Sequence, residues 1–520
     1  MKMRTSTIRT LLVAPLFAMA CSYDFPEPDP STLPSAGSAD FSKYVAIGNS
    51  LTAGYMDGAL YARGQSYSFT SILANQFKLV GGGEFNQPTV TSENGCYDPA
   101  TGCKAGRLRF VYDADGDATL GNTPGDASAL AAYTGDKTKL NNFGVPGLTI
   151  QTALTPLTGG PAAPTNPAFN PYYARFASAP GTSTVIGDAS AALKDAGTFF
   201  TFWLGNNDVI LYAVAGGDST KAPLTSVAAF KQAYPAALGA VLSANANTKG
   251  VVANIPDVTT LPHFYTVPWN VVAFDAGDPT DVGTVALLNA NFKGLNDALD
   301  ATVLYLGHDQ ADANKRKVKY ATGPNPILIY DEKLTSMATE FDMLQGAGAI
   351  NAQQRAALQP YVQSRPATAT DLITLVAATV IGTSAGSATA IWGVSVPLPD
   401  QYVLIPSETA QIQSRIATFN ATIKATVDAN SSRVILIDAN AILKKLAAAG
   451  TAGISLNGIG LTASLEPPYG FFSADGVHPN ARGSAYMANQ FINAINAGFN
   501  ANITPVNPND YPGNDLPIVP

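Results

Sequence analysis

The chain has 520 residues, carries a formal net charge of −8 and has charged side chains at only 13% of its positions. Phosphate binding requires clustered lysine and arginine, and since the sequence has no such cluster, we expect no nucleic-acid partner. Apolar residues make up 46%, which is enough for a large core, and no apolar run is as long as a membrane-spanning helix. The abundant glycine and proline indicate many turns and long connections.

Residues 1–20 have the pattern of an export signal: a basic stretch, a short apolar run, and small residues at Ala18 and Ala20. Cleavage by the ordinary secretory route would release a periplasmic or secreted protein. Alternatively, Cys21, which follows directly, resembles the lipidated cysteine of bacterial lipoproteins. The proline-rich, acidic segment 21–40 is typical of an extended tether, which favours the second interpretation. We therefore predict an outer-membrane or cell-surface lipoprotein that meets the membrane only through its lipid.

Cys96 and Cys103 are the two remaining cysteines, and the short segment between them contains an Asp-Pro pair and a glycine. In an oxidising compartment, two cysteines that close such a short turn predict a disulfide. Zinc is the alternative, but a tetrahedral zinc site needs four ligands and no histidine lies nearby. We therefore expect a disulfide and no metal site.

Four short apolar runs predict strands, and each is continuous, as expected for strands buried on both faces of a parallel sheet. Apolar residues at helical spacing over 288–299, 412–427 and 487–495 predict helices between and after them. This alternation predicts an α/β fold, a doubly wound parallel sheet with helices on both faces. The predicted strands are 44–47, 199–204, 251–255 and 434–437.

Long interruptions of this framework define the expected domain organisation. The α/β domain is expected at 41–300 and 400–500, with elaborated loops at 57–140 and 150–190. Residues 305–400 are expected to form an insertion or cap, and 505–520 a proline-rich tail.

Within the first long loop, the segment Asp113–Asp117 resembles a calcium-binding loop. Its glycine comes two positions too early for an EF-hand, and no glutamate follows at the twelfth position. A solvated turn is therefore favoured, and calcium binding there stays open.

Polar motifs follow two of the predicted strands and precede the last helix. Ser50 comes just after strand 44–47, and Asp475 and His478 lie three residues apart before the last helix. Ligands of open α/β sheets bind at the carboxyl ends of the strands, where these segments would meet. A serine nucleophile, a histidine base and a carboxylate that orients the histidine form a hydrolytic triad.

The same motifs contain candidate donors for an oxyanion hole. The Ser50 N–H, the Gly147 N–H and the side-chain amide of Asn207 are three candidate donors. Gly144 is an alternative to Gly147. Ser50 and Asn207 also have a purely structural interpretation, because serine and asparagine are common helix caps.

These blocks resemble those of the SGNH (GDSL) hydrolase family: Gly48-Asn49-Ser50-Leu51, then Gly147, then Gly205-x-Asn207-Asp208, then Asp475-x-x-His478, in the family's order. The resemblance implies a three-layer α/β/α fold with a flavodoxin-like sheet and an exported carboxylic ester hydrolase that needs no cofactor. It assigns Ser50 as nucleophile, His478 as base, and Gly147 and Asn207 as oxyanion donors. The chain departs from the family at Asn49, where aspartate is usual, and in the much longer spacing between blocks.

Other functions stay open. Gly382-Thr383-Ser384-Ala385-Gly386 fits the nucleophile elbow of α/β-hydrolases, although no helix is expected after it. A surface lipoprotein that only binds glycan through the same scaffold is a non-enzymatic alternative. For an enzyme, the substrate is a small-molecule or polymer-borne ester, either a lipid ester or an acetylated carbohydrate. The sequence does not indicate the oligomeric state.

Overall fold

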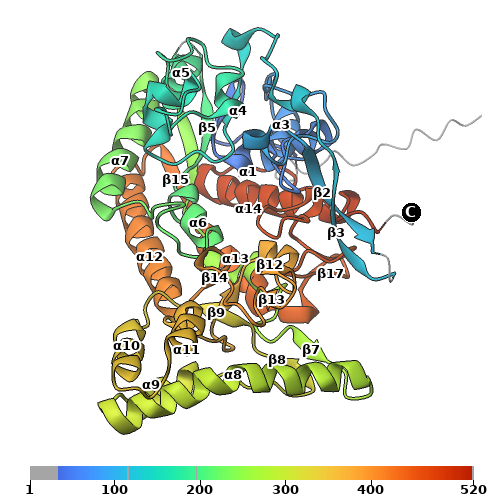
Figure 1. Cartoon of the computed structure of the whole chain (residues 1–520). Coiled ribbons are helices and arrows are strands. Elements are labelled where there is room, and N and C mark those ends of the chain that lie inside the picture. Colours follow the sequence, from blue (N-terminus) through green and yellow to red (C-terminus); the bar gives the residue numbers. More distant parts are fainter. Residues whose placement is uncertain (1–32, 114–115, 195, 518–520) are drawn as a thin grey trace, which may run out of the picture.

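The structure is a computed structural model that describes residues 33–113, 116–194 and 196–517 (Figure 1). The predicted signal peptide, Cys21 and most of the 21–40 segment lie outside these residues, as do Ala114 and Asp115 of the possible calcium loop. No helix within the described residues combines the length and the apolar character needed to cross a bilayer.

A five-stranded sheet in the order β15-β6-β5-β1-β4 forms the centre of the larger domain, and every neighbouring pair is parallel. The four strands expected from apolar runs are confirmed, and the short β4 is an addition. Strand order reverses between β1 and β5, so their connections leave in opposite directions and open a crevice at their carboxyl ends. The strands are β1 (Tyr44–Gly48), β4 (Asn142–Gly144), β5 (Phe199–Trp203), β6 (Lys249–Ala253) and β15 (Val434–Ile437).

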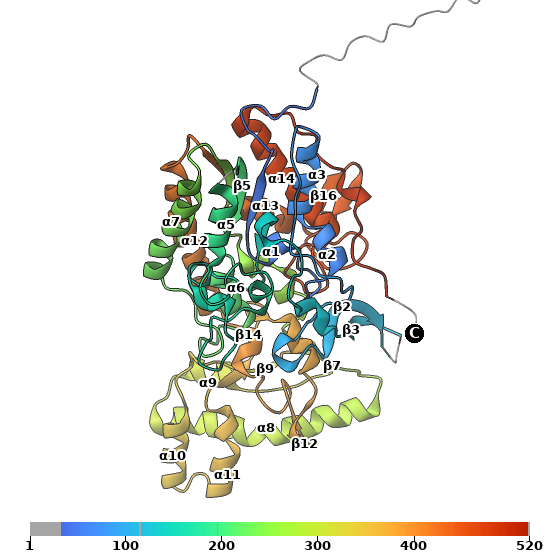
Figure 2. The ribbon, with the colours of Figure 1, turned by 90° about the horizontal axis from the view of Figure 1, so that it is seen from above.

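Helices cover both faces of this sheet, which makes the domain α/β as predicted (Figures 1 and 2). On one face, α7 (Val227–Ala244) packs against both α5 (Val185–Lys194) and α12 (Pro406–Asp428). On the other, α14 (Ala481–Phe499) packs against α3 (Phe69–Lys78). All residues of β1 and β5 are buried, in keeping with their apolar sequences.

A second lobe lies below the sheet domain in Figure 1 and has a hydrophobic core of its own, between Val267 and Ile405. Its long helix α8 contributes Leu288, Phe292 and Leu295 to that core. The predicted boundary near residue 300 is therefore wrong, because it assigned this helix to the α/β domain. Apolar spacing reveals a buried helical face but not the core that buries it. The helices of this lobe are α8 (Pro279–Leu306), α9 (Gln310–Arg316), α10 (Ala338–Gly346) and α11 (Ala352–Ala357).

Short antiparallel strand pairs complete the chain, four of them in the second lobe or at its edges. These four are β7 (Val272–Phe274) with β8 (Gly323–Asn325), β9 (Leu328–Tyr330) with β10 (Ser364–Pro366), β11 (Leu372–Ile373) with β14 (Val403–Leu404), and β12 (Ser384–Ser387) with β13 (Ala390–Ile391). Another pair, β16 (Ile454–Leu456) with β17 (Ile459–Leu461), precedes α14.

The segments expected to be loops are partly regular. Residues 57–140 contain α3, the short α2 (Ala62–Ser66) and a hairpin of β2 (Ala105–Tyr112) and β3 (Ala118–Pro124). Residues 150–190 contain α4 (Pro171–Ala174) and the start of α5. The tail also packs on the domain, because Asn514 Nδ2 donates a hydrogen bond of 2.8 Å to Phe472 O.

Candidate active site

Ser50 is the first residue of α1 (Ser50–Ala53), directly after β1, at the carboxyl edge of the sheet where the strand order reverses. Asn49 caps this short helix by accepting a hydrogen bond from Leu51 N at 3.1 Å. Glycine is required at position 48 because Thr52 packs closely against it: a Cβ there would lie 2.1 Å from Thr52 Oγ1. The strand-to-helix turn therefore presents the serine hydroxyl at the sheet edge, and asparagine serves as its cap.

A hydrogen-bonded triad runs through this serine. His478 Nε2 lies 2.8 Å from Ser50 Oγ, and His478 Nδ1 lies 2.8 Å from Asp475 Oδ2. Because the aspartate accepts from Nδ1, the other ring nitrogen is left to accept the serine proton. The structure thus brings together the three residues that the sequence assigned to a triad.

Asp475 is held as an ionised acceptor although it is buried. Its Oδ1 accepts hydrogen bonds from the Val477 and His478 backbone N–H groups, each at 2.8 Å. Its Oδ2 accepts from Gly58 N at 2.8 Å as well as from His478. Burial alone would raise the pKa of Asp475, but the electrostatic interaction with His478 and these hydrogen bonds hold it below the usual aspartate value. The carboxylate is therefore suited to orient the histidine.

The predicted oxyanion donors surround the serine turn. Val145 N donates to Gly48 O at 3.1 Å, which places the exposed Gly147 of the next loop beside this turn. Asn207 opens α6 (Asn207–Val214), and its Nδ2 donates to Leu148 O at 2.9 Å, which leaves one amide hydrogen for a ligand. Within the described residues, neither the Ser50 N–H nor the Gly147 N–H has a protein acceptor.

Gly144, the alternative donor, has a packing role instead. Its N–H is already used by Asn142 Oδ1 at 2.8 Å, and a Cβ at this position would lie 2.3 Å from Ala53 N. Of the two glycines, Gly147 is the one with a free N–H, and its φ of +77° suits glycine.

Asp208 ties the loop of residues 145–150 to α6. Its Oδ2 accepts from Ile150 N at 2.9 Å, whereas its buried Oδ1 has no partner in the described part of the chain. Burial raises the pKa of Asp208 to about 7, against the opposing hydrogen bonds from Ile150 and Thr225. This residue acts on the site through the position of the 145–150 loop.

A mainly apolar pocket opens next to Ser50 and His478 and holds about 530 Å³ of empty space, solvent at its mouth included. Asn206 also lines it, only 6% exposed, and neither its Oδ1 nor its Nδ2 has a hydrogen-bond partner in the described chain. An apolar group of a ligand would fit this lining, with one polar contact available at Asn206. Apolar lining residues include Trp203, Ile210, Leu261, Leu443, Phe472 and Met487.

Behind the triad, the turn at Asp57 and Gly58 supports the loop that carries Asp475. Asp57 N donates to Ser473 Oγ at 2.9 Å, and the Asp57 carboxylate accepts from Ala474 N at 3.0 Å and from Tyr61 Oη at 2.6 Å. Asp57 has a φ of +56°, a conformation rare for residues other than glycine. The chain keeps this conformation where one turn contacts two consecutive residues, Ser473 and Ala474, of the loop that carries Asp475.

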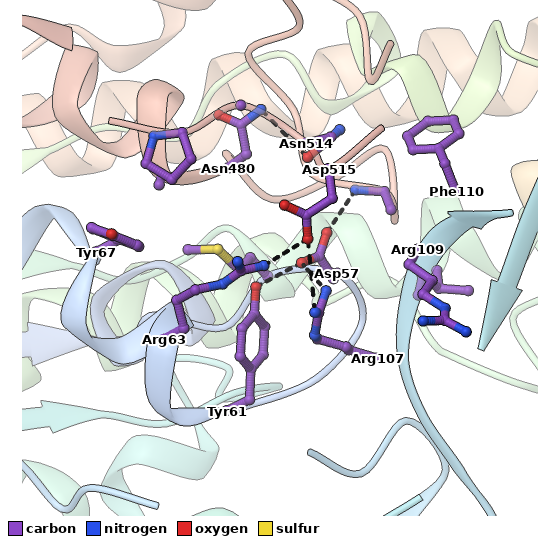
Figure 3. A pocket seen from close by; sticks show the side chains of 16 residues that line it. Asp57, Tyr61, Arg63, Tyr67, Arg107, Arg109, Phe110, Asn480, Asn514 and Asp515 are labelled. Atoms are coloured by element: carbon purple, nitrogen blue, oxygen red, sulfur yellow. Dashed lines mark hydrogen bonds and ion pairs between the residues drawn. The ribbon is translucent and has the colours of Figure 1, made fainter. Parts of the chain in front are cut away.

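Figure 3 shows the far side of this turn, a pocket where cationic and anionic side chains face one another. Arg107 lies between Asp57 at 3.7 Å and Asp515 at 3.9 Å, and Arg63 pairs with Asp515 at 2.8 Å. These pairs join the β2–β3 hairpin, α2 and the tail. They form a brace for the Asp57 turn, separate from the pocket at Ser50.

The remaining predicted residues have structural positions. Cys96 and Cys103 are joined by a disulfide, as expected. Ser384 lies on the exposed β12, where its hydroxyl donates to Ser387 O at 2.9 Å, and a strand instead of a helix follows it. Ser384 thus has no histidine partner among the described contacts, and its surroundings do not fit a nucleophile elbow.

Sequence reasoning missed four residues in or beside the site. Gly58 and Asp57 act through backbone groups and a buried carboxylate, and Asn206 was treated as the variable position of its motif. His263, which sits in no motif, is buried with its Nδ1 3.3 Å from Asp475 O. For these residues, the sequence offered one signal: the Asp57-Gly58 pair shortly after Ser50, which is typical of a turn.

No protein-family model, curated protein or solved structure matches this chain.

Proposed function

We propose that this protein is a carboxylic ester hydrolase of the SGNH type that works through an acyl-enzyme. The observation that carries the proposal is the chain of two 2.8 Å contacts from Ser50 Oγ through His478 to Asp475, at the carboxyl edge of a parallel sheet. A serine, a histidine and an ionised carboxylate in this order are the groups that nucleophilic acyl transfer requires.

The reaction would proceed in two halves. Ser50 Oγ attacks the ester carbonyl while His478 Nε2 takes its proton, and the same proton then goes to the leaving alkoxide, which departs as the alcohol. Water next attacks the acyl-enzyme, gives its proton to His478 and releases the acid as Ser50 is restored. Asp475 holds the imidazole in the required tautomer and stabilises its charged form. The proposal includes no metal or cofactor.

The negative oxygen of the tetrahedral intermediate would be bound by the donors around the serine turn. The N–H groups of Ser50 and Gly147 lack protein acceptors in the described chain, and Asn207 has a spare amide hydrogen. In a site shielded from water, each such donor lowers the barrier by about 3 kcal/mol.

The lining of the pocket at Ser50 favours an ester with an apolar group over a bare acetyl group. Trp203, Ile210 and Leu443 offer dispersion contacts to an acyl chain or an apolar alcohol, and few charged groups compete. Carbohydrate O-acetyl ester hydrolysis is the second candidate, supported by the exposed Gly147 side of the site, which can admit a bulky alcohol. Export and lipidation at Cys21 belong to the same proposal.

The decisive experiment combines a fluorophosphonate probe with a panel of p-nitrophenyl esters from acetate to palmitate. Wild-type protein should be labelled on Ser50, and Ser50→Ala should lose the label and at least three orders of magnitude in kcat/KM. Ser384→Ala is the matched control and should stay within a few-fold of wild type. If the probe labels Ser384, or if Ser50→Ala keeps its activity while folded by circular dichroism, the proposal is wrong.

A further inference from the structure

Three carboxylates meet where the second lobe joins the α/β domain, and none of them lines the pocket at Ser50. Glu332 follows β9, Asp400 precedes β14, and Glu408 lies in the first turn of α12. One oxygen of each carboxylate lies within 4.8 Å of those of the other two. The first two residues belong to the second lobe, while α12 packs into the core of the sheet domain through Ile412 and Ile416.

Glu408 is the buried member of this trio, with 1% of its surface exposed. Its Oε2 accepts from Ile405 N at 3.2 Å, but its Oε1 is buried and has no hydrogen-bond partner in the described chain. Asp400 Oδ1 is buried and unpartnered in the same way. Buried acceptors without donors cost free energy, so these oxygens indicate a ligand that supplies positive charge.

The nearby protein charge does not balance the trio. Lys333 Nζ pairs with Glu332 Oε1 at 2.8 Å, and among the described residues no ion pair reaches Asp400 or Glu408.

The wall opposite the carboxylates is a pair of glycines just after α6. A Cβ at Gly217 would lie 2.2 Å from Glu408 Cδ, and one at Gly216 would lie 2.3 Å from Asp400 O. Both have positive φ, so the turn fits glycine in conformation and in space. The backbone therefore comes close to the Glu408 carboxylate at Gly217 and to the main chain of Asp400 at Gly216, and only glycine permits these approaches.

We propose that Glu332, Asp400 and Glu408 bind one Ca²⁺ ion that holds the second lobe on the α/β domain. Carboxylate oxygens suit hard cations, and the lack of sulfur or nitrogen ligands in the trio disfavours zinc. Ca²⁺ binds oxygen at 2.3–2.6 Å, so ligands on opposite sides of the ion are about 5 Å apart, which is compatible with the spacing of the trio. Mg²⁺ prefers a tighter octahedron with several waters, and a cage of three protein carboxylates is less typical of it.

An effect of the ion on the proposed active site would be transmitted through α6. This helix begins at Asn207 and ends just before Gly216 and Gly217. Calcium should therefore act on stability first, and the inference does not rest on the hydrolase assignment.

Thermal unfolding of the full chain tests the proposal, after treatment with EDTA and dialysis, with and without 2 mM CaCl₂. Calcium should raise the unfolding midpoint, on the order of 5 °C, and calorimetric titration with CaCl₂ should give one site per chain. Asp400→Asn and Glu408→Gln should each abolish this shift. In EDTA, Glu408→Gln should unfold at the wild-type temperature or higher, because the amide keeps the size of the side chain and relieves the crowding of the three carboxyl groups.

Two controls separate this site from others. Asp297→Asn removes an exposed carboxylate from the same lobe and should keep the full calcium response. Asp117→Asn, in the loop that resembles a calcium site, should keep it too. The proposal is overturned if calcium gives no shift, if MgCl₂ gives an equal or larger one, if both Asp400→Asn and Glu408→Gln respond like wild type, or if Asp117→Asn alone abolishes the response.

Discussion

The Gly58 N–H donates a hydrogen bond of 2.8 Å to Asp475 Oδ2, the same oxygen that contacts His478 Nδ1. The two residues are 417 positions apart in the sequence. Gly58 O in turn accepts a hydrogen bond from Tyr55, whose ring lies 5.0 Å from the His478 ring. The turn after α1 thus contacts both Asp475 and His478 and helps to orient the two side chains together.

Asp57 should therefore matter for turnover although it does not touch the nucleophile. Asp57→Ala leaves Tyr61 Oη, Ala474 N and Arg107 without their buried partner, and we expect a midpoint several degrees lower and a kcat reduced about ten- to hundredfold. Asp57→Asn retains the size, an acceptor oxygen and tolerance of positive φ, so it should recover most of the activity. Steady-state kinetics with a p-nitrophenyl ester measure both. An effect on KM alone would contradict a positioning role.

Asp475→Asn should lower kcat on the order of 10³- to 10⁴-fold with little change in KM. The amide can present its NH₂ to His478 Nδ1 and so favour the tautomer in which Nε2 carries the proton and cannot accept one from Ser50. Far-ultraviolet circular dichroism should stay unchanged. A variant with near-normal kcat would remove Asp475 from the proposed mechanism.

Asp208 should make stability depend on pH. Its pKa is raised to about 7 in the folded protein, so the folded state binds this proton more tightly than the unfolded state. The contribution to stability is thus fully present below the usual aspartate pKa and is lost as pH rises through about 7. Asp208→Asn removes this loss, and its stability relative to wild type should grow between pH 5 and pH 8, by a few kcal/mol at most. Denaturant titrations at both pH values measure the difference; parallel curves would contradict it.

Asn206 should show a trade-off between stability and activity. Replacing its unpartnered buried amide by an apolar group of similar size, Asn206→Leu, removes a desolvation cost and should stabilise the fold by about 1 kcal/mol. The same change removes the polar contact in the pocket at Ser50, so kcat/KM should fall. Unfolding midpoints and ester kinetics on one preparation decide this; a less stable variant with full activity would contradict the reading of the pocket.

The strands with strong apolar runs could be predicted from sequence, whereas β4 could not. β4 has three residues and includes Asn142, whose buried Nδ2 donates to Thr52 O at 2.9 Å, so its signal is too short and too polar for a periodicity argument. The triad was predictable because each member follows or precedes a recognisable element. The partners of Asp475 were not, since a backbone N–H such as that of Gly58 leaves no trace in residue type.

The trio at the lobe junction shows the same limit. Asp400 and Glu408 lie close in sequence, but Glu332 comes from a distant segment and no known ligand spacing links the three, so only the folded structure brings the trio together. The predicted domain boundary was misplaced for a related reason. The apolar residues of α8 recur at helical spacing, and this spacing is equally compatible with packing in the core of the sheet domain or of the second lobe.

The separation of Ser50 from His478 by 428 residues sets an order of events during synthesis. The proposed nucleophile leaves the ribosome early, before its proposed base has been synthesised. Residues 512–515 then contact the start of α14, where Arg482 N donates to Pro512 O, and the brace at the Asp57 turn, where Asp515 pairs with Arg63. At about 5–20 residues per second, the serine is therefore without its base for tens of seconds. Under the proposed function, a nascent chain whose strand-to-helix turn has already formed therefore lacks the base that Ser50 needs and cannot yet hydrolyse an ester.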